Sequence, residues 1–201
     1  MIARIQNALL ENNYSFMLQP IFSRDGSINK YESLVRLDIS KSEKLLPVDF
    51  FHEAEKNESF KDILIASTQN TIEFLKINPS AKVAINISYK DIEHDDTMNE
   101  FMNVIKDEDD KVVERIIIEL IESFDIGNIE KVVGFCKRLK ERDIKISIDD
   151  FGIKNSNFYI LSIIDIDYLK IDGHFIKNIS REKTRFIVET IIGLCKKVVL
   201  K

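Results

Sequence analysis

Apolar residues recur at helical spacing in several segments of the chain, and runs rich in β-branched residues lie between them. The first two of these runs, 16–22 and 30–37, follow each other directly, whereas the later runs alternate with the helical segments. Strands that alternate with helices are typical of a parallel sheet with helical crossovers, which is either an open doubly wound sheet or a barrel. The pattern predicts helices over Pro47–Glu55, Phe60–Lys76, Asp95–Lys106, Asn128–Arg142, Ser156–Ile164 and Arg181–Val198, and later strands over 82–88, 115–122, 145–150 and 167–172.

The two faces of the predicted strands differ in polarity. In the run "KISIDD", Ile146 and Ile148 share one face, while Lys145, Ser147 and Asp149 share the other. The other strands likewise carry a polar side chain near their carboxyl ends. An open sheet covered by helices is apolar on both faces, whereas a barrel gathers its strand ends around an active site. The sequence therefore favours an α/β barrel over an open sheet.

Length and composition agree with one soluble core. The chain has 201 residues, of which 44% are hydrophobic, and no linker or repeat divides it, so one domain is the default. No apolar run approaches the length that spans a bilayer, and the polar residues of "MIARIQNALLENN" argue against a signal peptide. Cys136 and Cys195 lie far apart, as reduced thiols of a cytoplasmic protein do. The acidic run Asp107–Asp110 is interpreted as a solvated loop.

Candidate chemistry is concentrated at the strand ends. Carboxylate and amide oxygens without histidine or cysteine suit Mg²⁺ or Mn²⁺ and not a structural zinc. Two adjacent aspartates can bridge a pair of such ions, as in sites for in-line displacement at phosphorus, and the ions offset the repulsion between the carboxylates. A lysine beside them suits an anionic substrate or the positioning of a water molecule. The residues that the five strands offer are Glu32, Asn86, Glu119, Asp149 and Lys170, with Asp150 next to Asp149.

Each of these residues alone has a simpler explanation. A single acidic residue at a strand end is more often a helix cap or a surface charge. The letters "DDFG" also occur in protein kinases, but no glycine-rich loop or catalytic-loop motif accompanies them here. Five polar strand ends in register are harder to attribute to chance, so the pattern favours a functional site.

These residues carry a resemblance to a known family. The chain resembles the EAL domain family of cyclic di-GMP phosphodiesterases over nearly its whole length, and its spacings from Asn86 to Lys170 fit that family. The signature tripeptide stands here as "ESL", with Ser33 in place of the usual alanine. The matching motifs are "LQPIFSRDGSINKYESLVRL", "PVDFFHEAE", "INIS", "IIIELIES", "IDDFG" and "LKIDGHFI".

The resemblance implies a modified TIM-type barrel with one antiparallel strand. It further implies hydrolysis of cyclic di-GMP to the linear dinucleotide pGpG with two Mg²⁺ or Mn²⁺ ions. By motif, the metal ligands are Glu32, Asn86, Glu119, Asp149 and Asp150. The catalytic residues are Glu32, Asp149, Asp150 and Lys170, of which Lys170 orients or activates the attacking water. Gln19, Arg36 and Asp172 are implied substrate contacts, and Glu122 is implied to anchor the loop after "DDFG".

Two features depart from the family pattern. The loop after the double aspartate has the residues Ile153–Asn157 where the family has a Thr-Gly-Tyr-Ser-Ser-like stretch, which affects its coupling to Glu122. The chain also stops where the seventh strand would begin, and it lacks the family's Glu-Gly-Val-Glu-like motif. We therefore expect a single domain over 1–201 without the last two strands of the barrel, and no turnover by this chain alone.

Two functions stay open at this point. One is a metal-dependent phosphodiesterase; the other is a non-catalytic module that binds cyclic di-GMP or a protein partner, which the altered loop and the missing end favour. Retention of the ligand set favours the enzyme lineage. A homodimer is an analogy with the family. A nucleic-acid polymer is not an expected partner, because the net charge is −5.

Overall fold

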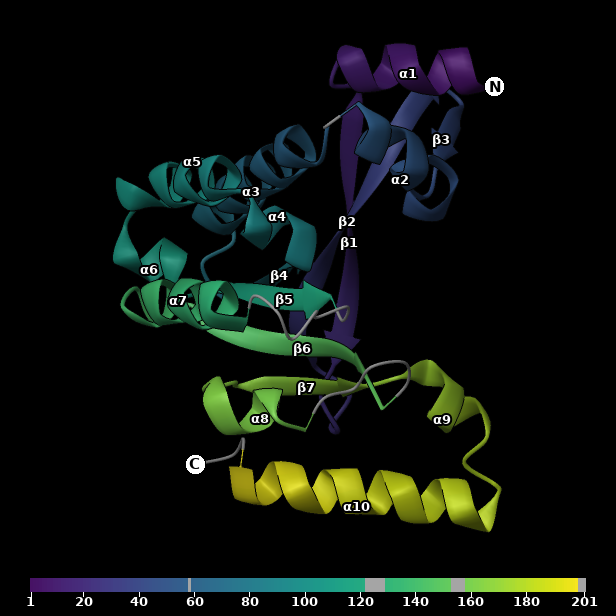
Figure 1. Ribbon diagram of the computed structural model, residues 1–201, viewed down its shortest axis with the longest axis vertical. Coiled ribbons are helices and arrows are strands. Elements are labelled where there is room, and N and C mark those ends of the chain that lie inside the picture. The colour runs from purple at the N-terminus through teal and green to yellow at the C-terminus, as the bar shows by residue number, and fades with distance from the viewer. Residues whose placement is uncertain (58, 122–128, 153–157, 199–201) are drawn as a thin grey trace. The chain divides into compact units, whose positions relative to one another are not determined.

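Two units make up the part of the chain that the computed structural model describes, residues 1–57, 59–121, 129–152 and 158–198. Unit 1 comprises residues 1–86 and 94–116, and unit 2 comprises residues 87–93 and 117–201. Each unit is described by itself. Unit 1 contains α1 (Ile2–Leu10), β1 (Tyr14–Phe22), β2 (Ile28–Ser40), β3 (Glu43–Leu45), α2 (Pro47–Lys56), α3 (Phe60–Ile77), most of β4 (Val83–Ser88), α5 (Asp95–Lys106) and α6 (Asp110–Val113) (Figure 1).

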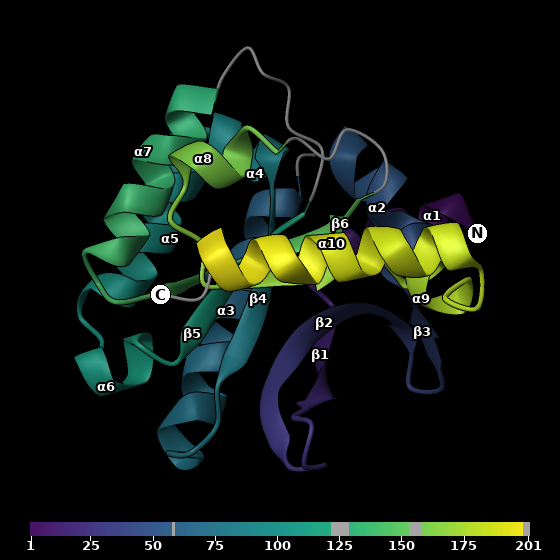
Figure 2. The same cartoon turned by 90° about the horizontal axis from the view of Figure 1, so that it is seen from below.

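Unit 1 is built on a long, curved antiparallel pair of strands, β1 and β2 (Figure 2). β3 pairs antiparallel with the end of β2, while β4 pairs parallel with its middle. Alternate residues of β2 point to opposite faces, and Leu37 is fully buried beneath α1 and α2 together with Phe50 and Leu9. Antiparallel β1 beside parallel strands agrees with the predicted α/β fold.

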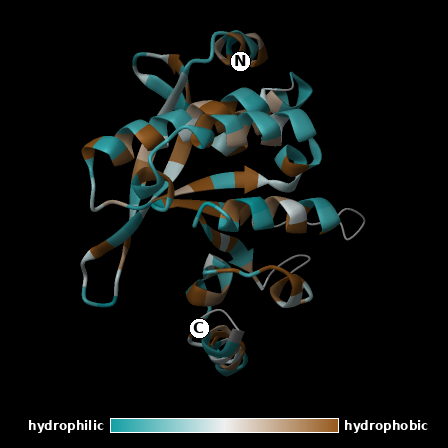
Figure 3. Ribbon diagram, turned by 90° about the vertical axis from the view of Figure 1, so that its left-hand side faces the viewer, coloured by the Kyte–Doolittle hydropathy of each residue, from teal (hydrophilic) through white to brown (hydrophobic). Residues whose placement is uncertain are grey.

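Unit 2 contains three parallel strands in the order β5–β6–β7. Hydrophilic and hydrophobic residues alternate along the helices of the ribbon (Figure 3). Because both faces of β5 are buried, it is a continuous apolar run interrupted only by Glu119. The elements of this unit are α4 (Tyr89–Glu93), β5 (Ile116–Ile121), α7 (Ile129–Lys140), β6 (Lys145–Phe151), α8 (Ile160–Ile163), β7 (Tyr168–Ile171), α9 (Gly173–Lys177) and α10 (Glu182–Val198).

A carboxylate fixes the register of β7 on β6. The Asp167 side chain accepts a hydrogen bond of 2.8 Å from the backbone N–H of Ile146, and its own N–H donates to the carbonyl of Ile146 at 2.8 Å. Lys140 forms an ion pair with the same carboxylate. This double connection sets which residues of β6 and β7 lie opposite each other further along the pair.

Several sequence predictions need correction. The run Asp107–Asp110 is not a solvated loop throughout, because Asp110 begins α6 and the Asp109 side chain accepts a hydrogen bond from the N–H of Lys111 as its cap. The helix predicted over Ser156–Ile164 is only Ile160–Ile163 among the described residues, since Phe158 and Tyr159 lie in a turn. The helix over Asp95–Lys106 and the six predicted strands lie within a few residues of their predicted bounds.

Cys136 and Cys195 are free, as expected, and burial raises the pKa of the Cys136 thiol to about 12, which keeps it protonated and unreactive near neutral pH. In the part of the chain that the structure describes, no helix is both long and apolar enough to cross a bilayer.

Candidate functional site

Lys170 joins two carboxylates from neighbouring strands of unit 2. Its ammonium group forms an ion pair with Oε1 of Glu119 on β5 and lies 3.1 Å from Oδ1 of Asp149 on β6. The side chain of Glu119 is 0% exposed, that of Asp149 is 20% exposed and that of Lys170 is 30% exposed. Since the three strands are parallel, their carboxyl ends meet at one edge. The edge thus carries two carboxylates that converge on one positive charge.

A β-bulge places the two adjacent aspartates. Ile148 pairs with Leu169 and Phe151 with Ile171, so Asp149 and Asp150 together oppose the single residue Lys170. Asp150 has a φ of 50°, in the left-handed region that aspartate adopts more readily than most residues. A bulge bends its strand and re-aims side chains. It therefore separates the two aspartates, leaving Asp149 half-buried beside Lys170 and Asp150 exposed.

Gly152 closes this end of β6 against α9. Its φ is +107°, and a Cβ atom built on it would lie 2.6 Å from Cε2 of Phe175. Only glycine combines that backbone conformation with so close an approach. The glycine of "DDFG" therefore has a local structural reason: it lets the chain leave the bulge under the ring of Phe175.

Replacing Gly152 by alanine is expected to lower the free energy of unfolding by about 1–3 kcal/mol, because it adds both backbone strain and a steric overlap. Urea unfolding followed by circular dichroism measures this. The matched control is Gly134→Ala within α7, where a Cβ meets nothing within 4 Å. That variant should gain up to about 1 kcal/mol in helix propensity. Equal unfolding midpoints for Gly152→Ala and the wild type would refute the packing role.

Asp172 caps α9. Its Oδ1 accepts a hydrogen bond of 2.5 Å from the backbone N–H of His174, two residues further on, as an N-cap does. Its own N–H donates to the carbonyl of Phe151 at 3.2 Å. The side chain proposed from the sequence to contact substrate thus has a structural task here, with one carboxylate oxygen used in the cap.

The second cluster of predicted residues lies in unit 1. Asn86 on β4 donates a hydrogen bond of 3.1 Å from Nδ2 to Oε1 of Glu32 on β2. Gln19 lies directly opposite Glu32 on β1 and is exposed. Ser33 is buried, with its hydroxyl 3.5 Å from that of Ser67 on α3, so the serine that replaces the family's alanine faces the helix. Glu32 and Asn86 therefore form one contact pair within unit 1.

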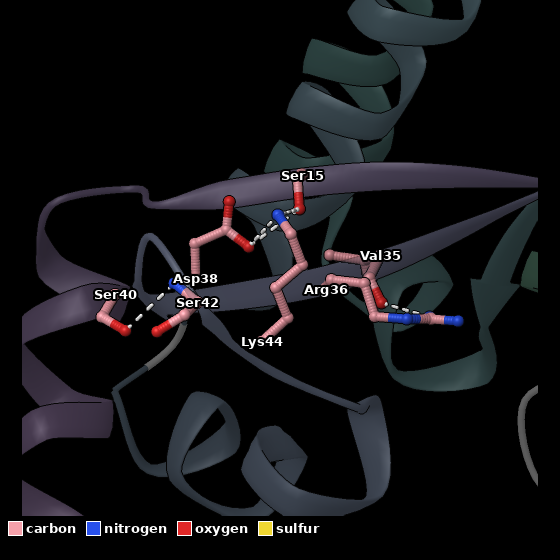
Figure 4. Close-up of polar contacts among 7 residues, drawn as sticks. All are labelled: Ser15, Val35, Arg36, Asp38, Ser40, Ser42 and Lys44. Atoms are coloured by element: carbon pink, nitrogen blue, oxygen red, sulfur yellow. Dashed lines mark hydrogen bonds and ion pairs between the residues drawn. The ribbon is translucent and has the colours of Figure 1, made fainter.

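Arg36 lies four residues beyond Glu32 on the same strand face. Its Nη1 donates to the carbonyl of Val35 at 2.8 Å, and its side chain is half-buried (Figure 4). Arg36 and Glu32 point to the same side of β2 because strand residues alternate. Glu122 and the loop residues Ile153–Asn157 lie outside the described residues.

The donor chemistry fits a hard divalent cation. Glu119 and Asp149 already share one cationic group, Lys170, which shows that their carboxylates can converge on positive charge. Carboxylate and amide oxygens are the ligands that Mg²⁺ and Mn²⁺ prefer. Within the described ranges of the chain, no group of three or more histidine, cysteine, aspartate or glutamate side chains is arranged around a common point. The fit therefore rests on the Glu119–Asp149 pair and on the Glu32–Asn86 pair, each within its own unit.

One polar residue near this edge did not enter the sequence prediction as a site residue. Ser147 lies in register between Glu119 and Tyr168, and its hydroxyl is buried without a hydrogen-bond partner among the described residues. A buried unpaired hydroxyl is uncommon and calls for an explanation, such as an ordered water. In the sequence, Ser147 could have been noticed because it is a serine among the isoleucines of a predicted strand.

A family model and a known relative both match the chain over nearly its whole length. The family model described as "EAL domain" matches residues 2–201. The chain is 28% identical over 201 residues to the cyclic di-GMP phosphodiesterase PdeF of Escherichia coli K12, covering 98% of this chain and 27% of that protein. The chain thus spans about a quarter of the length of this relative.

Solved structures show the same fold. An EAL domain protein from Listeria monocytogenes has a TM-score of 0.84 and 25% sequence identity, covering 98% of this chain and 79% of that one. The EAL domain of FimX from Pseudomonas aeruginosa, solved with c-di-GMP bound, has a TM-score of 0.81 and 21% identity, covering 98% and 81%. The likeness confirms the predicted α/β fold of the TIM-like barrel type. With its family model matched from residue 2 to residue 201, the chain belongs to the EAL domain family.

Proposed function

We propose that this chain is the EAL module of a cyclic di-GMP phosphodiesterase, which hydrolyses the cyclic dinucleotide to pGpG with Mg²⁺ or Mn²⁺. The observation that carries the proposal is the convergence of Glu119 and Asp149 on Lys170 at the carboxyl ends of adjacent strands. Catalytic residues lie at this end of the strands in TIM-type barrels. The names of relatives such as PdeF support the substrate.

In the proposed hydrolysis, each residue has a role that matches its chemistry. The ligands in this proposal are Glu32 and Asn86 in unit 1 and Glu119, Asp149 and Asp150 in unit 2, as the resemblance to the EAL domain family implies. When bound, the divalent cations supply Lewis-acid activation at phosphorus and at the attacking water. In hydrolysis, the oxygen of water bonds to one phosphorus, the P–O3′ bond breaks, and the leaving oxygen takes a proton.

The charged side chains are proposed to bind the substrate and to orient the attacking water. Lys170 is the group that holds the water in line, since its ammonium lies between the two carboxylates. Arg36 suits a phosphate oxygen because a guanidinium offers several donors in a planar fork. Gln19 is exposed beside Glu32 and can contact the base or the ribose. One carboxylate oxygen of Asp172, Oδ1, accepts the hydrogen bond that caps α9, and the other oxygen is proposed to contact the substrate.

A second candidate is a non-catalytic module that binds cyclic di-GMP. One sequence feature favours it: residues Ile153–Asn157 stand where the family has a Thr-Gly-Tyr-Ser-Ser-like stretch. In that case the strand ends keep their charge pairing for structure and for ligand binding, and no hydrolysis follows.

One experiment separates the two candidates. The complete gene product that carries this chain is incubated with cyclic di-GMP and saturating Mn²⁺ or Mg²⁺, the products are resolved by chromatography and mass spectrometry, and affinity is measured in parallel by calorimetry in Ca²⁺. Formation of pGpG supports the phosphodiesterase. Micromolar binding without product supports the non-catalytic module. A protein that shows no binding and forms no product would contradict both candidate functions.

A further inference from the structure

An aspartate lies within reach of the proposed phosphate-binding arginine. Asp38 follows Arg36 by two residues on β2, so both side chains are on the same face and their Cα atoms are about 6–7 Å apart. Arginine and aspartate at such a distance can form a bidentate ion pair. That pair would occupy the donors with which Arg36 is proposed to hold a phosphate.

The structure shows Asp38 bound elsewhere. Oδ1 of Asp38 accepts a hydrogen bond of 2.6 Å from Nζ of Lys44 and another of 2.9 Å from the hydroxyl of Ser15. The same ammonium group donates to the Ser15 hydroxyl at 2.7 Å. Lys44 is directly opposite Asp38 in the β2–β3 register, and Ser15 is directly opposite Arg36 in the β1–β2 register. The three side chains therefore form one closed polar cluster across three strands.

Arg36 forms its hydrogen bond with a group other than Asp38. Its Nη1 contacts the carbonyl of Val35, and among the described residues it has no ion pair. In Figure 4 the Lys44 side chain rises between Asp38 and Arg36, while the guanidinium extends away from Asp38. Lys44 thus supplies the positive charge that Asp38 would otherwise take from Arg36.

We infer that Lys44 is a positioning residue for substrate: it neutralises Asp38 and so keeps the Arg36 guanidinium available to a phosphate of the cyclic dinucleotide. The inference rests on the proposed function, in which Arg36 contacts that phosphate. A cluster that only fastened β3 to β2 would need Lys44 and Asp38 equally. The positioning role instead makes Asp38 harmful to binding once Lys44 is gone.

The two roles predict different double-variant results. Affinity for cyclic di-GMP is measured by calorimetry in Ca²⁺ at low salt for Lys44→Met, Asp38→Asn, Lys44→Arg and the double variant Lys44→Met/Asp38→Asn. We expect Lys44→Met to bind about two- to fivefold more weakly, the scale of a partly exposed ion pair. Asp38→Asn, Lys44→Arg and the double variant should bind like the wild type. The loss should also shrink at high salt.

Lys76→Met is the matched control, because it breaks the ion pair of 2.7 Å with Glu108, a surface pair in the same unit. It should leave affinity unchanged. If the double variant binds as weakly as Lys44→Met, or if Lys44→Met binds like the wild type, the positioning role is overturned.

A second measurement separates this proposal from the proposed function. The side-chain Nε–Hε resonance of Arg36 is followed by NMR without ligand. It should shift in Lys44→Met, as an Arg36–Asp38 pair forms, and return in the double variant. Wild-type chain that binds no cyclic di-GMP would contradict the proposed function, while the NMR result still decides whether Lys44 keeps Asp38 from Arg36. An unshifted resonance in Lys44→Met overturns the inference.

Discussion

Replacing Lys170 by methionine is expected to lower the free energy of unfolding of the metal-free chain by about 3–5 kcal/mol. The Glu119 side chain is 0% exposed and forms an ion pair with Lys170, so the variant leaves a buried carboxylate without its cation. Methionine keeps the length and the apolar stem of lysine, which limits the change to the charge. Urea unfolding in the presence of EDTA measures the loss. The proposed role in orienting water also predicts about 10²–10⁴-fold slower turnover by the complete gene product.

The double variant Glu119→Gln/Lys170→Met identifies the cause. When both charges are removed, no isolated charge stays buried, and most of the lost stability should return. Lys76→Met is again the control, because the pair that it breaks is exposed and contributes about 0–1 kcal/mol. An unfolding midpoint of Lys170→Met equal to that of the wild type would show that the pair does not stabilise the strand ends.

In the complete gene product, replacing Asp149 by asparagine should reduce turnover of cyclic di-GMP by about 10³-fold or more, with little change in stability. Asparagine keeps the shape of the side chain but removes one of the two charges that converge at the strand ends, and the several kcal/mol that a divalent ion supplies correspond to such a factor. Lys170 keeps its ion pair with the buried Glu119 in this variant, so the structural cost is small. Rates at saturating Mn²⁺, together with urea unfolding, test both parts.

The control for this prediction is Asp165→Asn, which removes an exposed carboxylate of the same unit before β7. It should retain the wild-type rate, which excludes a general effect of net charge. Turnover by Asp149→Asn within tenfold of the wild type would remove Asp149 from the proposed ligands.

The long elements could be predicted because their side chains repeat with a clear period. The helix over Asp95–Lys106 has the predicted bounds, since its apolar face extends over three turns. The prediction included neither α1 nor the short elements β3, α4, α6 and α9, and the short ones are too brief for a period to show. For α6 and α9 the only local signals are the capping residues Asp109 and Asp172, and an isolated aspartate is ambiguous.

The candidate site was predictable in its residue types but less so in its geometry. Counting every second residue assumes a regular strand, whereas the bulge at Asp149 and Asp150 breaks the alternation. The positive φ of Asp150 and the close approach of Gly152 to Phe175 depend on packing that no local pattern encodes. The link between Lys44 and Asp38 likewise becomes visible only when the register of β2 and β3 is known.

The central claim is that Glu119 and Asp149 hold a divalent cation at the carboxyl ends of β5 and β6. Crystals of the chain grown with Mn²⁺ and cyclic di-GMP, with diffraction collected at a wavelength where manganese scatters anomalously, test it most directly. We predict an anomalous peak within bonding distance of both carboxylates, with Lys170 moved away from at least one of them. A map without a peak there, in which Lys170 still bridges Glu119 and Asp149, would contradict the claim.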